Sequence, residues 1–272
     1  MPNLDLRPLS LGEILDRTFT LYRRHFLLFI GICGIPQLLV LAFSLTQIFA
    51  TASTRVSVSL SLILMLLFVV ASLVAYILSQ GGTILAVSEL YLGRSASIGA
   101  ALRKVSGEFA PLLGVIVLNG LAVMGGAILL VIPGIYVACR LIICLPVALI
   151  EGKGPRDSLS RSWDLTRENA GRSFLILLLS IIIAYAALAF FAAPFTIAVA
   201  LNVRNPGMLH FWTAMLQIGS TIATVLTRPI LLIATSIFYY DLRVRKEAFD
   251  IQFMLNPESQ RAPNAAGLPS IV

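Results

Sequence analysis

Residues 60–92 read LSLILMLLFVVASLVAYILSQGGTILAVSELYL, and Glu89 is the only charged residue in this stretch. The hydrocarbon core of a bilayer is about 30 Å thick, and about 20 helical residues cross it. The stretch is therefore long and apolar enough to cross a membrane as an α-helix. Five further runs have the same character, so the sequence predicts an all-α bundle of six spans, at residues 26–50, 60–92, 110–132, 134–150, 172–200 and 209–240.

The third and fourth predicted spans meet at Ile132-Pro133-Gly134, a tight turn signal. An alternative interpretation merges the two runs into one re-entrant hairpin. Their combined length of about 40 residues favours two true spans, because each then has enough residues to cross the bilayer.

Composition excludes a soluble domain. Of the 272 residues, 58% are hydrophobic and 12% are charged, whereas soluble domains have about 45–50% apolar and about 25% charged residues. The formal charge is +7, and the basic residues lie in short segments between apolar runs. That distribution is typical of a protein that faces an anionic leaflet, and no nucleic-acid motif accompanies it.

The basic residues also predict the orientation. They concentrate before the first span, in the two segments that follow the second and fourth spans, and after the sixth span, while the opposite loops contain only Arg55 and Arg204. Because segments rich in Lys and Arg stay in the cytoplasm, we expect both termini to be cytoplasmic. The pattern suits a bacterial inner membrane.

Three amphipathic helices are predicted on the cytoplasmic face, at residues 10–24, 95–108 and 155–168. Ser10 and Glu13 fit a capping box at the start of the first one. Each amphipathic helix leads into an odd-numbered span, and the even spans end on Glu89, Glu151 and Asp241. We interpret residues 1–255 as one membrane domain of three pseudo-repeated units, and residues 256–272 as a disordered tail.

The three carboxylates at the span ends have a structural and a functional interpretation. A carboxylate at a helix C-terminus opposes the helix dipole and favours a cationic partner. The structural interpretation is therefore preferred, with partners from the amphipathic helices: Arg17, Arg103 and Arg161. The functional interpretation makes the chain a membrane-surface lipid enzyme that depends on Glu89, Glu151 or Asp241.

Three stretches carry a family resemblance. Leu6-Arg7-Pro8-Leu9-Ser10-Leu11-Gly12-Glu13 leads to Tyr22-Arg23-Arg24, Pro133-Gly134-Ile135-Tyr136 leads through Arg140 to Leu145-Pro146, and Tyr239-Tyr240-Asp241-Leu242-Arg243 closes the sixth span. Together they resemble the membrane domain found fused to some bacterial glycerophosphodiester phosphodiesterases, and its stand-alone relatives. The resemblance implies a bacterial inner-membrane protein, and it does not carry over the phosphodiesterase activity, which belongs to a separate soluble domain.

The sequence offers little chemistry for catalysis. His25 and His210 are predicted near opposite faces of the bilayer, and Cys33, Cys139 and Cys144 lie in apolar runs without the spacing of metal ligands. No motif of a hydrolase or of a phosphate-binding loop is present. We therefore expect no enzyme activity, no catalytic residue, no cofactor and no metal.

Arg140 and Arg228 are the most informative residues. Each is predicted to lie within a span, about 15 Å or more from its cytoplasmic end, and an intramembrane charge is by default a functional-site hypothesis. Gln80 and Asn119 are expected at similar depth. One interpretation has the arginines lock helix packing, and the other has them line a polar cavity for an anion such as a phosphate or a lipid headgroup.

The first hypothesis is thus a non-enzymatic membrane protein that binds or transports a lipid headgroup or small anion. Its ligand would contact Arg140, Arg228, Gln80 and Asn119. The alternative is a scaffold whose amphipathic helices dock a partner or remodel the leaflet. The bilayer itself is the one partner that both hypotheses share, and the oligomeric state stays open.

Overall fold

The computed structural model describes residues 7–52 and 58–247, and these residues form ten α-helices and no strand. The predicted tail at 256–272 lies outside the described residues. In chain order the helices are α1 (Leu11–Arg24), α2 (Phe26–Ala52), α3 (Val58–Tyr91), α4 (Ile98–Gly107), α5 (Phe109–Leu129), α6 (Val131–Arg140), α7 (Cys144–Glu151), α8 (Pro155–Leu165), α9 (Ala170–Leu201) and α10 (Pro206–Glu247).

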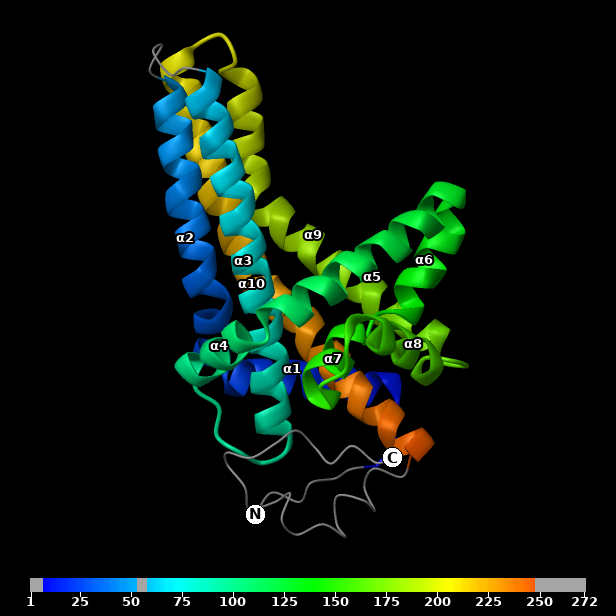
Figure 1. The fold of residues 1–272 in the computed structure, drawn as a ribbon. Coiled ribbons are helices and arrows are strands. Elements are labelled where there is room, and N and C mark those ends of the chain that lie inside the picture. The colour runs from blue at the N-terminus through cyan, green and yellow to red at the C-terminus, as the bar shows by residue number, and fades with distance from the viewer. Residues whose placement is uncertain (1–6, 53–57, 248–272) are drawn as a thin grey trace.

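Six segments are long and apolar enough to cross a membrane, as the sequence indicated. They are α2, α3, α5, α6 together with α7, α9 and α10. Helices α2, α3, α9 and α10 run side by side as a long bundle, in which α10 contacts the other three (Figure 1). Helices α5 and α6 pair with each other and diverge from the upper half of this bundle.

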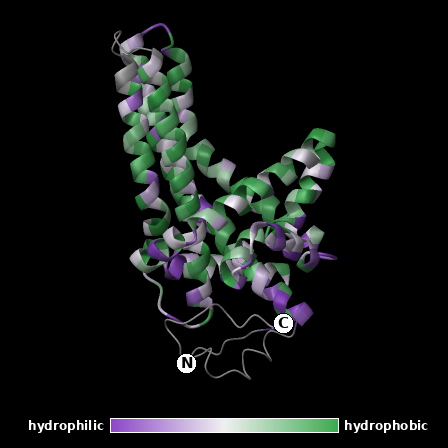
Figure 2. Ribbon diagram, viewed as in Figure 1, coloured by the Kyte–Doolittle hydropathy of each residue, from purple (hydrophilic) through white to green (hydrophobic). Residues whose placement is uncertain are grey.

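Helices α1, α4, α7 and α8 lie together at the lower end of the bundle, and we call them the base layer (Figure 1). Hydrophilic residues gather at this level, whereas the bundle above it is mostly hydrophobic (Figure 2). Each amphipathic helix starts with a local signal: a capping box between Ser10 and Glu13, a cap by the Ser97 side chain, and Pro155 in the first turn. These satisfy or remove free N–H groups at the helix start.

The fourth apolar segment is not the continuous helix that the sequence suggested at 134–150. It divides into α6 and α7, with a turn at residues 141–143 between them. Pro146 provides the physical reason, because it has no N–H to donate to the carbonyl of Ile142 and its ring clashes there. As a result Arg140 lies at the end of a helix rather than in the middle of one.

The most deeply buried part of the structure is the lower half of α10. Tyr239, Tyr240 and Leu242 are fully buried, and Asp241 between them is 1% exposed. The Tyr240 hydroxyl lies 2.7 Å from Ser88 Oγ on α3, and its ring stacks on Tyr91. This segment packs against α1, α3, α7 and α9, so it is the centre around which the base layer is arranged.

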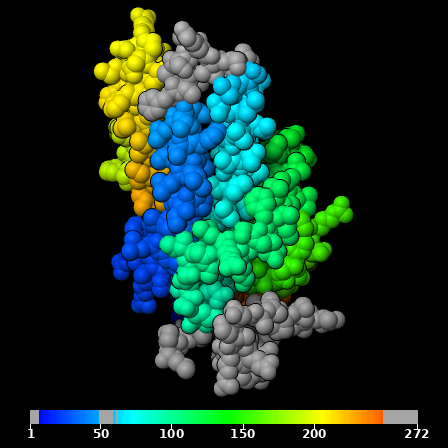
Figure 3. Space-filling view, turned by 60° about the vertical axis from the view of Figure 1, so that its left-hand side comes forward, coloured from blue at the N-terminus to red at the C-terminus, as the bar shows by residue number. Residues whose placement is uncertain are grey.

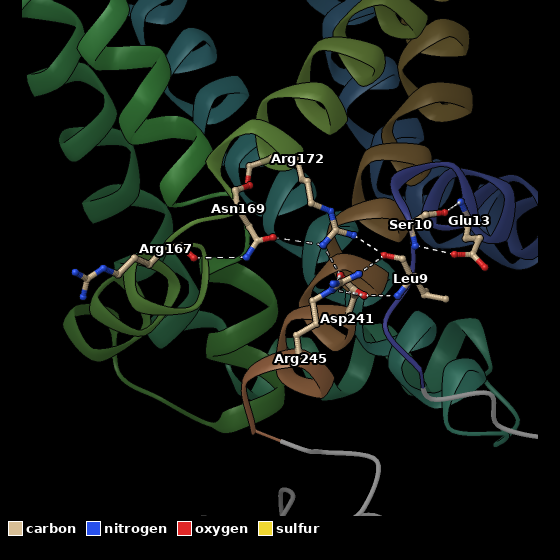
Figure 4. A network of polar contacts seen from close by, with 9 residues as sticks. Leu9, Ser10, Glu13, Arg167, Asn169, Arg172, Asp241 and Arg245 are labelled. Carbon is tan, nitrogen blue, oxygen red and sulfur yellow. Dashed lines mark hydrogen bonds and ion pairs between the residues drawn. The ribbon is translucent and has the colours of Figure 1, made fainter.

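A buried ionic cluster joins the two ends of the described chain (Figure 4). The Asp241 carboxylate accepts the backbone N–H of Leu9 at 2.6 Å and pairs with Arg172 at 2.8 Å and Arg245 at 3.0 Å. Both guanidinium groups also donate to the carbonyl of Leu9, at 2.7 and 2.6 Å. We call this cluster the Asp241 clasp, since it holds the segment before α1 against α9 and α10.

Replacing Asp241 with Asn should destabilise the protein by about 3 kcal/mol, because removing one partner of a buried pair leaves Arg172 and Arg245 partly buried without a counter-charge. The loss is measured by titrating the folded protein, in a mild detergent, with SDS and comparing the midpoints of unfolding. Asp16→Asn, the same chemical change at an exposed position on α1, is the matched control. Equal midpoints for both variants would show that the clasp contributes no stability.

The capping box of α1 makes a pH prediction. Hydrogen bonds from the backbone and side chain of Ser10, and then from Arg7, lower the pKa of the Glu13 carboxyl from 4.5 to about 2. A carboxyl with a lowered pKa stabilises the fold above its unfolded pKa, and the contribution is lost as the pH falls from 4.5 towards 2. The pH dependence of unfolding between those values should therefore flatten in Glu13→Gln relative to the unmodified protein, and an unchanged slope would contradict the assignment.

Candidate functional site

A polar cavity of about 430 Å³ lies between α3, α9 and α10. This volume falls within the range of about 300–1,000 Å³ that is usual for small-molecule sites. Its wall is mainly aliphatic, and a few polar side chains interrupt it: Tyr76, Gln80, Ser180, Tyr185, Thr227 and Arg228. We call it the Arg228 cavity.

Pro229 and Tyr22 shape α10 beside the cavity. Pro229 cannot donate to the carbonyl of Val225, so one helical hydrogen bond is missing within α10. The Tyr22 hydroxyl, from the end of α1, donates to the carbonyl of Leu226 at 2.8 Å. Burial raises the pKa of Tyr22 to about 12, so this hydroxyl keeps its proton and remains a donor. The contact ties the amphipathic helix α1 to the turn of α10 that carries Arg228.

Arg228 has no anionic partner among the described residues. Its guanidinium carbon lies 5.3 Å from the centre of the Tyr76 ring, and no hydrogen bond or ion pair of its side chain occurs within the described part of the chain. Gln80, one turn after Tyr76, is 8% exposed, and its Oε1 has no hydrogen-bond partner. Because an amide has both a carbonyl acceptor and an NH2 donor, this side chain can offer either to the cavity.

The serine and threonine hydroxyl groups of the cavity are already committed as donors. Ser180, Thr224 and Thr227 donate to carbonyls of their own helices, each at 2.8 Å. Their oxygens retain only acceptor capacity. An anion in the cavity would therefore find its donors on Arg228, Gln80 and the hydroxyl groups of Tyr76 and Tyr185, whereas a ligand with hydroxyl groups could also use the threonines.

Arg140 has a different environment and does not line the Arg228 cavity. It is 5% exposed and donates to the carbonyl of Trp163 on α8 at 2.5 Å, with its guanidinium carbon 4.5 Å from the Trp163 ring centre. Ser162 and Thr166 both donate to the Arg140 carbonyl at 2.9 Å. These contacts fasten the end of α6 to α8. The predicted site is therefore divided, since the structure brings Arg228 and Gln80 together but places Arg140 elsewhere.

Asn119 lies on α5, outside the lining of the Arg228 cavity, and its buried Oδ1 has no partner. The carboxylates at the ends of the apolar segments all have cationic partners. Glu89 pairs with Arg94 at 3.5 Å, and Asp241 belongs to the clasp. Arg17 donates to the Tyr91 hydroxyl at 3.3 Å, and Arg103 is exposed on α4.

Glu151 is the carboxylate that pairs with a predicted partner. It accepts Arg161 Nε at 3.1 Å and the Tyr239 hydroxyl at 3.0 Å, and Arg161 also pairs with Glu247. Burial opposes the charge of Arg161, but Glu151 and Glu247 outweigh it and raise the pKa of Arg161. The described residues contain no group of three or more potential metal ligands, and Cys33, Cys139 and Cys144 are buried as free thiols.

Comparison with known families adds a direct result. The family model for the membrane domain of glycerophosphoryl diester phosphodiesterase matches residues 112–262, more than half of the chain. The chain belongs to this family. Searches of curated proteins and of solved structures found no significant match. The recognition made from short motifs is confirmed, and the chain is a multi-pass membrane protein of this family.

The match to this membrane domain covers only part of the candidate site. Arg140, Arg228, Glu151 and Asp241 lie within residues 112–262, whereas Tyr76 and Gln80 precede them. Sequence reasoning missed Tyr76 and Tyr22. Tyr76 had a detectable signal, because it lies four residues before Gln80 and positions four apart share one face of a helix. The contact of Tyr22 with Leu226 joins residues 204 apart in sequence and had none.

In this family member, Arg140→Gln should reduce stability rather than ligand binding. The substitution removes a charge-assisted hydrogen bond to the Trp163 carbonyl and the stacking on Trp163, which together predict a loss of about 2 kcal/mol. Thermal unfolding in detergent measures it, with Arg156→Gln, at an exposed position on α8, as the matched control. An Arg140→Gln protein as stable as the control would contradict the structural role.

Proposed function

We propose that the chain is a non-enzymatic membrane protein that binds a phosphoryl group in the Arg228 cavity. The group would belong either to a phospholipid headgroup or to a small phosphate anion. The observation that carries the proposal is Arg228 itself, a cation on an apolar helix with no anionic partner among the described residues, facing a cavity of about 430 Å³. An unpaired intramembrane charge costs free energy, and a bound anion would offset that cost.

The chemistry of the cavity suits a phosphoryl oxygen. A guanidinium group donates two parallel hydrogen bonds to phosphate, and the Gln80 amide supplies a third donor from α3. The Tyr76 ring supports the guanidinium from one face, which fixes its plane and leaves its edge for a ligand. The low dielectric of the surroundings strengthens these interactions relative to water.

The position of the cavity relative to the base layer favours a lipid headgroup as the source of the phosphoryl group. Tyr22, at the end of the amphipathic helix α1, reaches the carbonyl of Leu226, two residues before Arg228. Arg228 is thus within one helical turn of a residue in contact with the base layer. If the base layer lies at the membrane surface, as its amphipathic helices favour, the phosphates of that leaflet are close to the guanidinium.

The finer topology is part of the same proposal. Both termini are taken as cytoplasmic, in the inner membrane of a bacterium, with the base layer on the cytoplasmic face. Three units are proposed, each with an amphipathic helix followed by two apolar segments: α1 with α2 and α3, α4 with α5 and the segment α6–α7, and α8 with α9 and α10. The support is that α1, α4 and α8 each precede their pair directly in the chain.

Arg228→Gln should weaken phosphoryl binding by about ten- to a hundredfold, since a hydrogen bond to a charged group contributes about 1.5–3 kcal/mol. Its unfolding midpoint should stay close to that of the unmodified protein, because the lost contact with Tyr76 is worth only about 1 kcal/mol. Delipidated protein in detergent is titrated with a phosphoryl-bearing probe, and native mass spectrometry measures the fraction of protein with the probe bound. Arg204→Gln, an exposed arginine in the turn between α9 and α10, is the control for loss of charge.

Two probes distinguish the source of the phosphoryl group. Short-chain phosphatidylglycerol tests the headgroup, and inorganic phosphate tests the free anion. Binding of the lipid alone identifies a headgroup site, and binding of both probes identifies recognition of the phosphoryl group itself. Equal affinities of Arg228→Gln, Arg204→Gln and the unmodified protein for both probes would overturn the proposal and direct attention to a scaffold role of the base layer.

A further inference from the structure

We propose that α5 and α6 form a re-entrant hairpin, which enters the hydrocarbon core from the side of the base layer and returns without crossing it. The partner of its tip is then the acyl chains near the middle of the bilayer. In this arrangement α2, α3, α9 and α10 are the complete crossings, and both ends of the hairpin remain on the side of α4 and α8.

The first argument is the anchor of α6. Arg140, its last residue, donates to the Trp163 carbonyl, while Ser162 and Thr166 donate to the Arg140 carbonyl. All three partners lie in α8 or directly after it, and α8 carries the charges of Arg156, Asp157, Arg161 and Asp164. A helix with this composition belongs at the polar surface of the membrane. The lower end of α6 is therefore held at that surface.

The second argument is length. From Arg140 to the turn, α6 has 10 residues, which span about 15 Å at about 1.5 Å per residue. The hydrocarbon core is about 30 Å thick, so α6 alone reaches only its middle. The segment is long enough to cross only together with α7, and α7 lies in the base layer. Helix α5 has 21 residues, but it is inclined to the bundle axis and ends at the same height as α6 (Figure 1).

The third argument is the polarity of the tip. Ile128, Leu129, Leu130, Val131 and Ile132 are consecutive and 69–80% exposed. The turn between α9 and α10, at the far end of the bundle, exposes Arg204 and Asn205 beside the apolar Leu201 and Val203, whereas the five exposed residues of the hairpin tip are all apolar. Figure 2 shows hydrophilic residues at that turn and hydrophobic residues at the hairpin tip. Figure 3, turned about the vertical axis, again shows the hairpin (green) ending lower than the upper end of α3 (cyan).

The backbone of the turn satisfies part of its polar groups internally, which matters in lipid because unsatisfied polar groups are costly there. The Leu130 N–H donates to the Gly126 carbonyl at 3.2 Å, and the Gly134 N–H donates to the Leu130 carbonyl at 3.2 Å. Pro133 has no N–H to satisfy. Gly126 and Gly134 let the two backbones approach closely, since a Cβ on Gly126 would lie 3.1 Å from the Cα of Gly134. Among the described residues, the N–H groups of Val131 and Ile132 are the donors at the turn that have no backbone partner.

Nitroxide depth measurements in reconstituted bilayers test the proposal. Single cysteines are introduced at Met124, Leu130 and Tyr136, with Arg204→Cys and Lys153→Cys as the aqueous references on opposite sides. Each label is then probed by collision with oxygen and with a water-soluble nickel chelate. The native cysteines are buried, and the unsubstituted protein gives the background. Leu130 is exposed, so its replacement removes no core packing, and the unfolding midpoint verifies the fold.

A re-entrant hairpin places the Leu130→Cys label deepest of the three, about 15 Å from the surface, with the Met124 and Tyr136 labels shallower. A hairpin that crosses the membrane gives the opposite order, with the Leu130→Cys label as accessible to the nickel chelate as the Arg204→Cys label. That second result would overturn the proposal. Because these depth measurements use no ligand, their outcome is independent of phosphoryl binding at Arg228.

Discussion

The arrangement of the base layer depends on neutralising one buried carboxylate. Asp241 lies near the C-terminal end of α10, the longest of the described helices, where burial without compensation would cost several kcal/mol. Arg172 from the start of α9, Arg245 one turn further along α10 and the backbone of Leu9 all converge on it. Because the compensating groups come from three separate segments, α1, α9 and α10 can take only one relative position. The carbonyl of Leu9 accepts from both guanidinium groups, which closes the cluster and fixes the chain before it enters α1.

The helices could be located from sequence because each rests on a local property. Apolar length, the capping box at Ser10 and the proline at Pro155 act within a few residues, and the bilayer imposes the same minimum length on every span. The break in the fourth segment was also encoded locally, by Pro146, but its apolar composition concealed it. The clasp could not be read in advance, since Leu9 and Asp241 are 232 residues apart and nothing local to Asp241 distinguishes Arg172 from the other arginines.

The candidate site shows the same division between local and non-local information. An arginine within an apolar run is visible in the sequence, and so is Gln80 on another run, but the sequence does not say which polar residues share a cavity. Tertiary packing puts Arg228 and Gln80 together and sends Arg140 to α8. The partner of Arg140 is a backbone carbonyl, which every residue possesses, so no composition or spacing could have indicated it.

Arg140 and Arg228 compensate the loss of guanidinium hydration in two different ways. A guanidinium removed from water must regain hydrogen bonds or a favourable field. Arg140 regains part of them from a carbonyl and an aromatic ring of α8, while its buried Nε has no partner among the described residues, so its charge is used to join helices. Arg228 has the ring of Tyr76 on one face, and its remaining donors face a cavity. Since five N–H donors of one guanidinium cannot be satisfied by a single ring, the unmet requirement lies at the cavity, and it is there that a ligand gains most by binding.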